Sequence, residues 1–125
     1  MKAVLLSIKP EFAHKIFDGT KKYEFRKQIF KDSSIKKVIV YSSSPEQKVI
    51  GEFTIDDILN DTPSDLWLQT RDYSGITQAF YEEYFRGRKN AYAIKVESTK
   101  LYEQKKNLSD FDIIYPPQSF AYVEV

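Results

Sequence analysis

Hydrophobic and polar residues are patterned along the chain in a way that predicts mainly β-structure. An almost continuous apolar run at residues 3–9 is typical of a buried strand, and stretches of alternating character indicate half-buried strands. Five or six strands are expected, drawn from residues 3–9, 21–28, 37–42, 48–56, 91–102 and 120–125. Gly51 interrupts one of these stretches, which indicates a bulge or a close approach of another part of the chain.

Two regions carry the spacing of amphipathic helices. Pro10 stands at a favourable first helical position, the apolar residues that follow it share one face, and Gly19 is placed to end the helix. A second helical region within residues 57–90 begins near Pro63 and ends at Gly87. Its apolar stripe consists of Ile76, Phe80 and Tyr84. The pattern therefore predicts two or three helices.

The connections between these elements are too varied for a repeated βαβ series, so we predict an α+β fold that is mainly β. A small closed or nearly closed barrel of five to six strands, with two or three helices packed outside, fits best. Closure would also remove exposed sheet edges. Tyr23 and Phe25 would fill the inside of this barrel, which leaves Glu24 and Arg26 pointing outward into a groove under the helices. The length suits a single domain over residues 1–125.

The amino-acid composition narrows the available chemistry. The chain has no cysteine, which excludes disulfides, thiolate zinc sites, iron–sulfur clusters and cysteine nucleophiles. Its one histidine, His14, lies at the polar edge of the first predicted helix, and any Ser-His-Asp triad would depend on it. We therefore expect no metal and no cofactor, and chemistry based on Lys, Arg, Asp, Glu, Ser, Thr and Tyr.

The apolar segments also bear on the location of the protein. No stretch approaches the roughly 20 apolar residues of a membrane span, and the run at residues 4–8 is too short for a signal peptide. The sequence therefore predicts a cytoplasmic protein with no membrane partner.

The formal net charge of +1 conceals an uneven distribution. Residues 1–50 carry 11 Lys and Arg against 5 Asp and Glu, a balance of +6, whereas residues 51–125 carry 8 against 13, a balance of −5. The basic half could form one side of a nucleic-acid-binding surface. It could equally pair with the acidic half across the fold.

A short segment at residues 19–26 concentrates groups that can hold a polar ligand. Glu24 and Arg26 share one face of the predicted strand, and Lys21 joins them if the backbone is still turning where the strand begins. A cation–anion–cation cluster in a groove can bind a phosphate, a carboxylate or the polar edge of a base. The alternative is a surface salt bridge of Glu24 with Arg26 or Lys21, worth at most about 1 kcal/mol.

The same segment resembles a known family signature. Gly19, Lys21, Glu24 and Arg26 match all four positions of the G-x-K-x-x-E-x-R motif of the ASCH (activating signal cointegrator homology) family. The likeness extends over most of the chain, through residues 5–10, 41–45, 49–53 and 116–120. The resemblance implies a PUA-like pseudobarrel with a cleft between barrel and helix that is lined by the signature residues. It also implies binding of RNA or nucleotides.

One small ASCH branch that resembles this chain in size is an amidohydrolase acting on N4-acetylcytidine. That branch uses the signature lysine, a threonine at the position of the signature glutamate, and an acidic residue from a later loop. Lys21 matches the lysine, Glu24 stands in place of the threonine, and Asp72 is the candidate for the later acid. This departure from the branch's pattern leaves both binding and hydrolysis open.

The first hypothesis is therefore an RNA- or nucleotide-binding module. Lys21 and Arg26 would contact phosphate or a base carbonyl, and Glu24 would accept hydrogen bonds from a base amino group. Further candidate ligand-binding residues are Gly19 from the signature, Ser43 and Ser44, whose loop can contact phosphate, and Tyr41 and Trp67, on which a base can stack. A core position is the alternative for Trp67.

The second hypothesis is a small metal-independent hydrolase acting on a modified nucleoside or on RNA. Burial beside Arg26 would lower the pKa of Lys21 and suit it to act as a base, whereas the neighbouring Glu24 would raise that pKa. Glu24 could instead activate water. The third hypothesis is a protein-interaction domain, which an exposed apolar patch around Tyr81 and Phe85 would favour.

Overall fold

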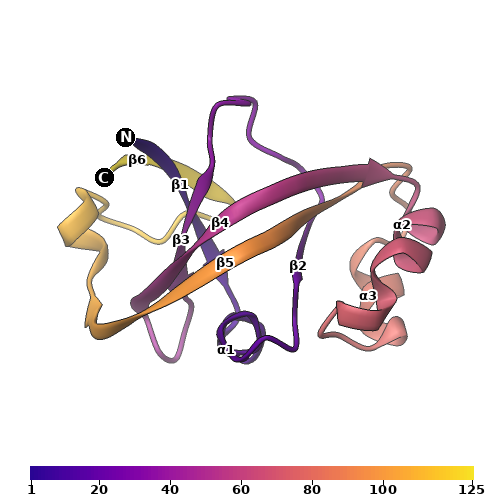
Figure 1. Cartoon of the computed structure of the whole chain (residues 1–125), viewed down its shortest axis with the longest axis horizontal. Helices are drawn as coiled ribbons and strands as arrows, with labels where there is room; N and C mark the ends of the chain where they lie inside the picture. The colour runs from indigo at the N-terminus through magenta and orange to yellow at the C-terminus, as the bar shows by residue number, and fades with distance from the viewer.

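The computed structural model describes residues 1–125 and is built around one six-stranded sheet (Figure 1). The strands are β1 (Lys2–Ile8), β2 (Tyr23–Arg26), β3 (Lys37–Ser42), β4 (Lys48–Asp61), β5 (Ala91–Lys106) and β6 (Phe120–Glu124). The helices are α1 (Pro10–Asp18), α2 (Pro63–Thr70) and α3 (Gln78–Tyr84), with short 3₁₀ turns η1 (Arg71–Tyr73) and η2 (Leu108–Phe111). This confirms the predicted α+β, mainly β class.

The sheet is open, so of the two predicted forms, a closed or a nearly closed barrel, the fully closed one is wrong. Its order is β2-β5-β4-β3-β1-β6, and no strand pairs the two ends. The β2 edge is short, and side chains cover two carbonyl groups at its end. Tyr84 donates to the oxygen of Phe25 in β2 at 3.3 Å, and Arg88 donates to the oxygen of Lys27, directly after β2, at 3.2 Å. A short edge with covered polar groups avoids the hazard of a free edge without closure.

The sheet nevertheless curls far enough to bring β2 close to β1. These strands are separated by β5, β4 and β3 in the sheet, yet the Arg26 side chain at the end of β2 reaches the Ser7 oxygen in β1 at 3.4 Å. α1 connects the two strands and lies between them in Figure 1. In a closed barrel, backbone hydrogen bonds would join β2 to β1. In this open sheet, the Arg26 side chain bridges the two strands instead.

The two faces of β2 pack against different parts of the core. Glu24 pairs with Ile94, which belongs to the main apolar cluster beneath α1, whereas Phe25 pairs with Ala93, which packs under α2 and α3. The prediction that Tyr23 and Phe25 fill the inside of the curved sheet is therefore wrong. The reason is that α2 and α3 cover the outer face with their own aromatic residues, so an aromatic face of β2 is buried there as well.

Gly51 in β4 and the aromatic residues in and directly after α3 show how closely the elements pack. A Cβ at Gly51 would lie 2.6 Å from both the Lys100 oxygen and Cζ of Phe17, which confirms the predicted close approach. Tyr81 and Phe85 are both buried, so they form no exposed patch.

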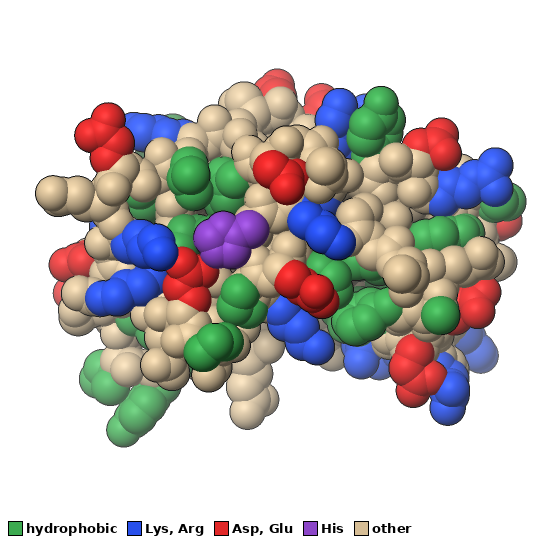
Figure 2. All heavy atoms as spheres, turned by 90° about the horizontal axis from the view of Figure 1, so that it is seen from below, with side chains coloured by type: hydrophobic (Ala, Val, Ile, Leu, Met, Phe, Trp, Pro, Cys, Tyr) green, Lys and Arg blue, Asp and Glu red, His purple; other side chains and the backbone are tan.

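The face that carries α1 shows side chains of both charges interspersed, with the single histidine at the surface (Figure 2). His14 Nε2 lies 2.8 Å from Glu46 Oε1, and Lys37 in the basic half pairs with Glu52 in the acidic half at 2.9 Å. The uneven charge along the sequence is thus partly balanced in space. None of the helices combines the length and the hydropathy needed to cross a membrane.

Candidate functional site

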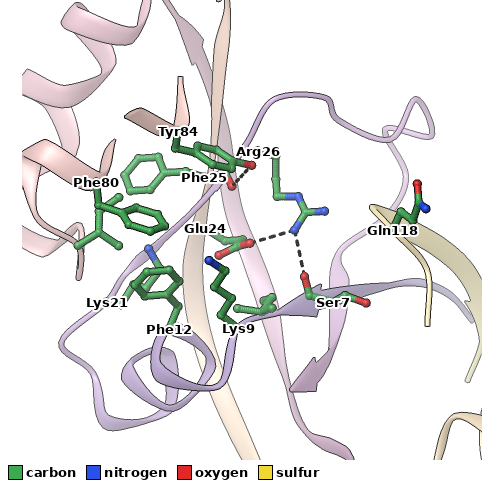
Figure 3. Close-up of a pocket in the computed structure, with 12 residues that line it drawn as sticks. Ser7, Lys9, Phe12, Lys21, Glu24, Phe25, Arg26, Phe80, Tyr84 and Gln118 are labelled. Carbon is green, nitrogen blue, oxygen red and sulfur yellow. Dashed lines mark hydrogen bonds and ion pairs between the residues drawn. The ribbon is translucent and has the colours of Figure 1, made fainter. Parts of the chain in front are cut away.

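An open cavity of about 310 Å³ lies where the end of β1, the start of α1, β2 and α3 meet (Figure 3). We call this cavity the cleft. The structure brings Lys21, Glu24 and Arg26 together in its lining. The remaining lining residues are Ser7, Ile8, Lys9, Phe12, Phe25, Ile76, Phe80, Tyr84 and Gln118.

Lys21 is a buried cation at the back of the cleft. It lies in the turn between α1 and β2, and its side chain is only 2% exposed. Its ammonium donates a hydrogen bond to the Ser74 oxygen at 2.7 Å and lies 4.8 Å from the ring centroid of Phe25 and 5.5 Å from that of Phe12. One carbonyl and two aromatic faces replace part of its hydration shell.

Burial dominates the electrostatics of this lysine. Loss of solvent lowers the pKa of Lys21 to about 8, against the opposing effect of Glu24, which raises it, and with a further lowering from Lys15. The competition that the sequence left open is therefore decided by desolvation. At neutral pH the ammonium form of Lys21 still predominates. The neutral amine becomes the main form as the pH rises above about 8.

Glu24 and Arg26 form a partly buried pair that differs from a surface salt bridge. Arg26 Nη1 donates to Glu24 Oε2 at 3.1 Å, and the two side chains are 12% and 8% exposed. Nη2 of the same guanidinium donates to the backbone oxygen of Ser119 at 2.8 Å and to its hydroxyl at 3.3 Å. Arg26 thus holds the segment before β6 against the cleft. The second carboxylate oxygen of Glu24, Oε1, makes no hydrogen bond with the protein.

The mouth of the cleft combines an exposed cation with aromatic rings. Lys9 Nζ lies 5.3 Å from the ring centroid of Phe80, and that ring packs edge-on against Phe12 at 5.1 Å. Figure 3 shows the Lys9 and Lys21 side chains extending toward Glu24 from the α1 side.

Sequence reasoning missed several of these lining residues. The i, i+4 spacing of Phe80 and Tyr84 was a detectable signal for a shared face, but it did not say what that face meets. Lys9 could have been recognised as a cation at the end of a predicted strand, because it directly precedes Pro10. Gln118 carried no signal that distinguishes it from a loop residue.

Three of the predicted ligand-binding residues lie away from the cleft. Tyr41 is buried in a second apolar cluster on β3, with Leu5 and Val49. Ser43 and Ser44 lie in the turn between β3 and β4, where the Ser43 amide donates to the Ile8 oxygen at 2.9 Å. None of these three lines the cavity.

The other predicted residues are also placed outside the cavity lining. Gly19 ends α1 in a left-handed conformation with φ of 88°, and Asp72 is exposed in η1. Trp67 is half-buried on α2, with its ring centroid 4.7 Å from that of Tyr81, and it lines a different cavity.

Comparison with known proteins identifies the class to which this fold and site belong. A family model described as the ASCH domain matches residues 6–100, and the chain belongs to this family. The crystal structure of ASCH from Zymomonas mobilis superimposes with a TM-score of 0.88 at 26% identity, over 98% of this chain and 87% of that one. The N-terminal domain of McrB from Staphylothermus marinus shares the fold more distantly, with a TM-score of 0.51 at 14% identity.

Curated relatives carry names of different kinds. The ASCH domain-containing ribonuclease of Zymomonas mobilis is 27% identical over 128 residues, which cover 98% of this chain and 84% of that protein. In Ureaplasma parvum, the large ribosomal subunit protein uL22 is 26% identical over 121 residues and ATP synthase subunit alpha is 32% identical over 122 residues. The chain spans only 39% and 15% of the lengths of these two proteins.

Proposed function

We propose that the cleft binds RNA or a nucleotide and accommodates a single base. The observation that carries this proposal is the convergence of the Lys21 ammonium and the free Glu24 Oε1 in an open cavity of about 310 Å³. Small-molecule sites occupy about 300–1,000 Å³, so this cavity has the size for one nucleotide and not for a duplex. The membership of the ASCH family and the relative named as a ribonuclease support a role connected with RNA.

Each group in the cleft has a role that its surroundings suit. Glu24 Oε1 accepts a hydrogen bond from a base amino group, while Phe80 and Tyr84 provide aromatic surface against which the base stacks. Lys9 and Lys21 supply positive charge for a phosphate. Arg26 positions Glu24, because the hydrogen bonds of its guanidinium are directed to the protein.

Nucleotide and short-RNA titrations at several salt concentrations test this assignment. Lys21→Ala and Glu24→Gln are expected to weaken binding at least tenfold, since each removes a charged group from a partly desolvated site. Lys22→Ala is the matched control, because Lys22 is exposed and lies over the Tyr73 ring outside the cleft. Equal affinities for wild type, Lys21→Ala and Glu24→Gln would refute the cleft assignment.

A metal-independent hydrolase is the second candidate function. The observation that favours it is the combination of a free carboxylate oxygen on Glu24 with a buried ammonium on Lys21, whose pKa is about 8. In RNA cleavage, Glu24 would take the proton of a ribose 2′-hydroxyl, whose oxygen attacks the adjacent phosphorus. Lys21 would donate a proton to the departing 5′ oxygen as its bond to phosphorus breaks. The exposed Asp72 has no part in this scheme.

Incubation with short RNAs and with N4-acetylcytidine separates the two candidates. Cleavage of RNA that is lost in both Glu24→Gln and Lys21→Ala supports the ribonuclease, and release of acetate from N4-acetylcytidine supports an amidohydrolase. Protein that binds RNA or a nucleotide but turns over neither substrate is a binding module.

A further inference from the structure

The structure contains a second cavity on the far side of α3 from the cleft. Phe80 and Tyr84 of α3 face the cleft, whereas Gln78, Tyr81 and Glu82 line the other cavity, so one short helix forms a wall of both. This second cavity, of about 390 Å³, runs between α2 and α3, and we call it the α2–α3 groove.

The floor of the α2–α3 groove is apolar and partly exposed. Trp67 is half-buried against Tyr81, and Leu68 beside it is 63% exposed. Tyr81 is fixed by a hydrogen bond from its hydroxyl to the Pro63 oxygen at 2.6 Å, which ties α3 to the start of α2. The groove is thus an apolar surface between two helices that are tied together, with a large exposed apolar side chain at its rim.

The charge of the groove is opposite to that of the cleft. The cleft lining includes three cations, Lys9, Lys21 and Arg26, against one carboxylate, Glu24, whereas the only charged residue of the groove lining is Glu82. The sequences of α2 and α3 include three carboxylates and no lysine or arginine. This charge pattern repels a phosphate backbone and attracts a cation.

Glu82 is the carboxylate that remains available within the groove. Its Oε1 accepts a hydrogen bond from the neutral amide of Gln78 at 3.2 Å, and it has no ion-pair partner. Its neighbour Glu83 is paired with Arg86 and does not line the groove. Glu82 therefore has unused capacity for a basic group next to the apolar floor.

We propose that the α2–α3 groove is a docking site for a basic peptide segment of a partner protein. An apolar side chain of that segment packs on Trp67 and Leu68, and an adjacent lysine or arginine pairs with Glu82. This site is independent of the proposed nucleotide cleft, from which the body of α3 separates it.

The single tryptophan makes the proposal directly measurable, because Trp67 fluorescence reports on the groove alone. The probes are the capped tripeptides Lys-Leu-Lys and Glu-Leu-Glu, with adenosine monophosphate as the nucleic-acid probe. The basic tripeptide is expected to shift Trp67 emission with an affinity about fivefold higher than the acidic one, as one exposed ion pair provides. This preference should disappear in Glu82→Gln and persist in Glu83→Gln, the matched control on the same helix.

Two further results bear on the same proposal. Leu68→Ala, a change at an exposed position, is expected to weaken binding of the basic tripeptide without loss of folding. Glu24→Gln, a change in the cleft on β2, should leave the response unchanged, which separates this site from the cleft. Equal responses to the two tripeptides, a stronger response to adenosine monophosphate, or no response to any probe would overturn the proposal.

Discussion

The Lys21 ammonium donates a hydrogen bond to the Ser74 oxygen at 2.7 Å, so the segment that connects α2 to α3 forms the back of the cleft. Lys21 and Ser74 are 53 residues apart in sequence. A neighbouring backbone hydrogen bond, from the Lys22 amide to the Tyr73 oxygen at 2.8 Å, fixes the same contact. The signature lysine is thereby buried by a part of the chain that carries no signature residue.

Replacement of Lys21 by methionine is expected to stabilise the protein while weakening ligand binding. Methionine fills the site with an apolar chain of similar length and removes the cost of desolvating the ammonium. The lowering of the Lys21 pKa from 10.5 to about 8 corresponds to about 3 kcal/mol, and loss of the bond to Ser74 offsets part of it. We expect the free energy of unfolding at pH 7 to rise by about 1–2 kcal/mol, as measured by denaturant titration.

The pH dependence of this effect has a defined sign. Folding lowers the pKa of Lys21, so between about pH 8 and 10.5 the folded protein binds fewer protons at this site than the unfolded chain. The cost of burying the ammonium is therefore complete below about pH 8 and is relieved as the pH rises to 10.5. The advantage of Lys21→Met over wild type should shrink across this window. A pH-independent advantage, or the same profile in the control Lys22→Met, would contradict the assignment.

Gly75→Ala is expected to destabilise the protein and to displace Lys21 at the back of the cleft. Gly75 has φ of 69°, and a Cβ at this position would lie 2.6 Å from Cγ of Lys21. The left-handed backbone alone costs an alanine about 1–2 kcal/mol, and the clash with Lys21 adds to this loss of stability. Nucleotide affinity should fall as well, because the ammonium must move. A double-mutant cycle with Lys21→Gly isolates the steric contribution, and purely additive losses would mean that the two side chains do not meet.

Phe80→Ala is expected to impair binding far more than stability. The ring lies at the cleft mouth and is 37% exposed, so its removal leaves a small packing defect. Stacking of a base on an aromatic ring contributes about 1–3 kcal/mol, which predicts a loss of about tenfold or more in nucleotide affinity. Tyr73→Ala removes another exposed ring, 50% exposed and outside the cleft, and serves as the control. Similar affinities for both variants would argue against stacking on Phe80.

The strands and helices could be predicted from the local pattern of the sequence, whereas the open edge of the sheet at β2 could not. Apolar runs and alternation mark every strand, and Pro10 and Pro63 begin α1 and α2 as expected. The extra length of β4 and β5, which extend to Asp61 and Lys106, follows from their pairing with each other. The open edge at β2 depends on covering groups such as Tyr84, whose contact with β2 no local pattern encodes.

The site was predictable to the extent that its residues are close in sequence. Lys21, Glu24 and Arg26 fall within one turn and one short strand, so the segment that holds them could be identified in advance. The placement of Tyr41 and Trp67 depended on which faces other elements cover, and spacing alone does not determine that. The pKa of Lys21 likewise depends on burial by a distant loop.

Arg26→Lys is expected to show that the signature arginine acts as a positioning residue. The guanidinium spans Glu24, Ser7 and Ser119, and an ammonium on a shorter, non-forked side chain cannot hold all three. We expect a loss of about 1–3 kcal/mol in the free energy of unfolding. Hydrogen exchange should accelerate at the amides of residues 118–120 and remain unchanged in α2. Glu24→Gln is the informative comparison, because it should weaken nucleotide binding while leaving the segment before β6 protected. If Arg26→Lys weakens binding but leaves exchange at residues 118–120 as in wild type, the guanidinium contacts the ligand directly and the positioning role is refuted.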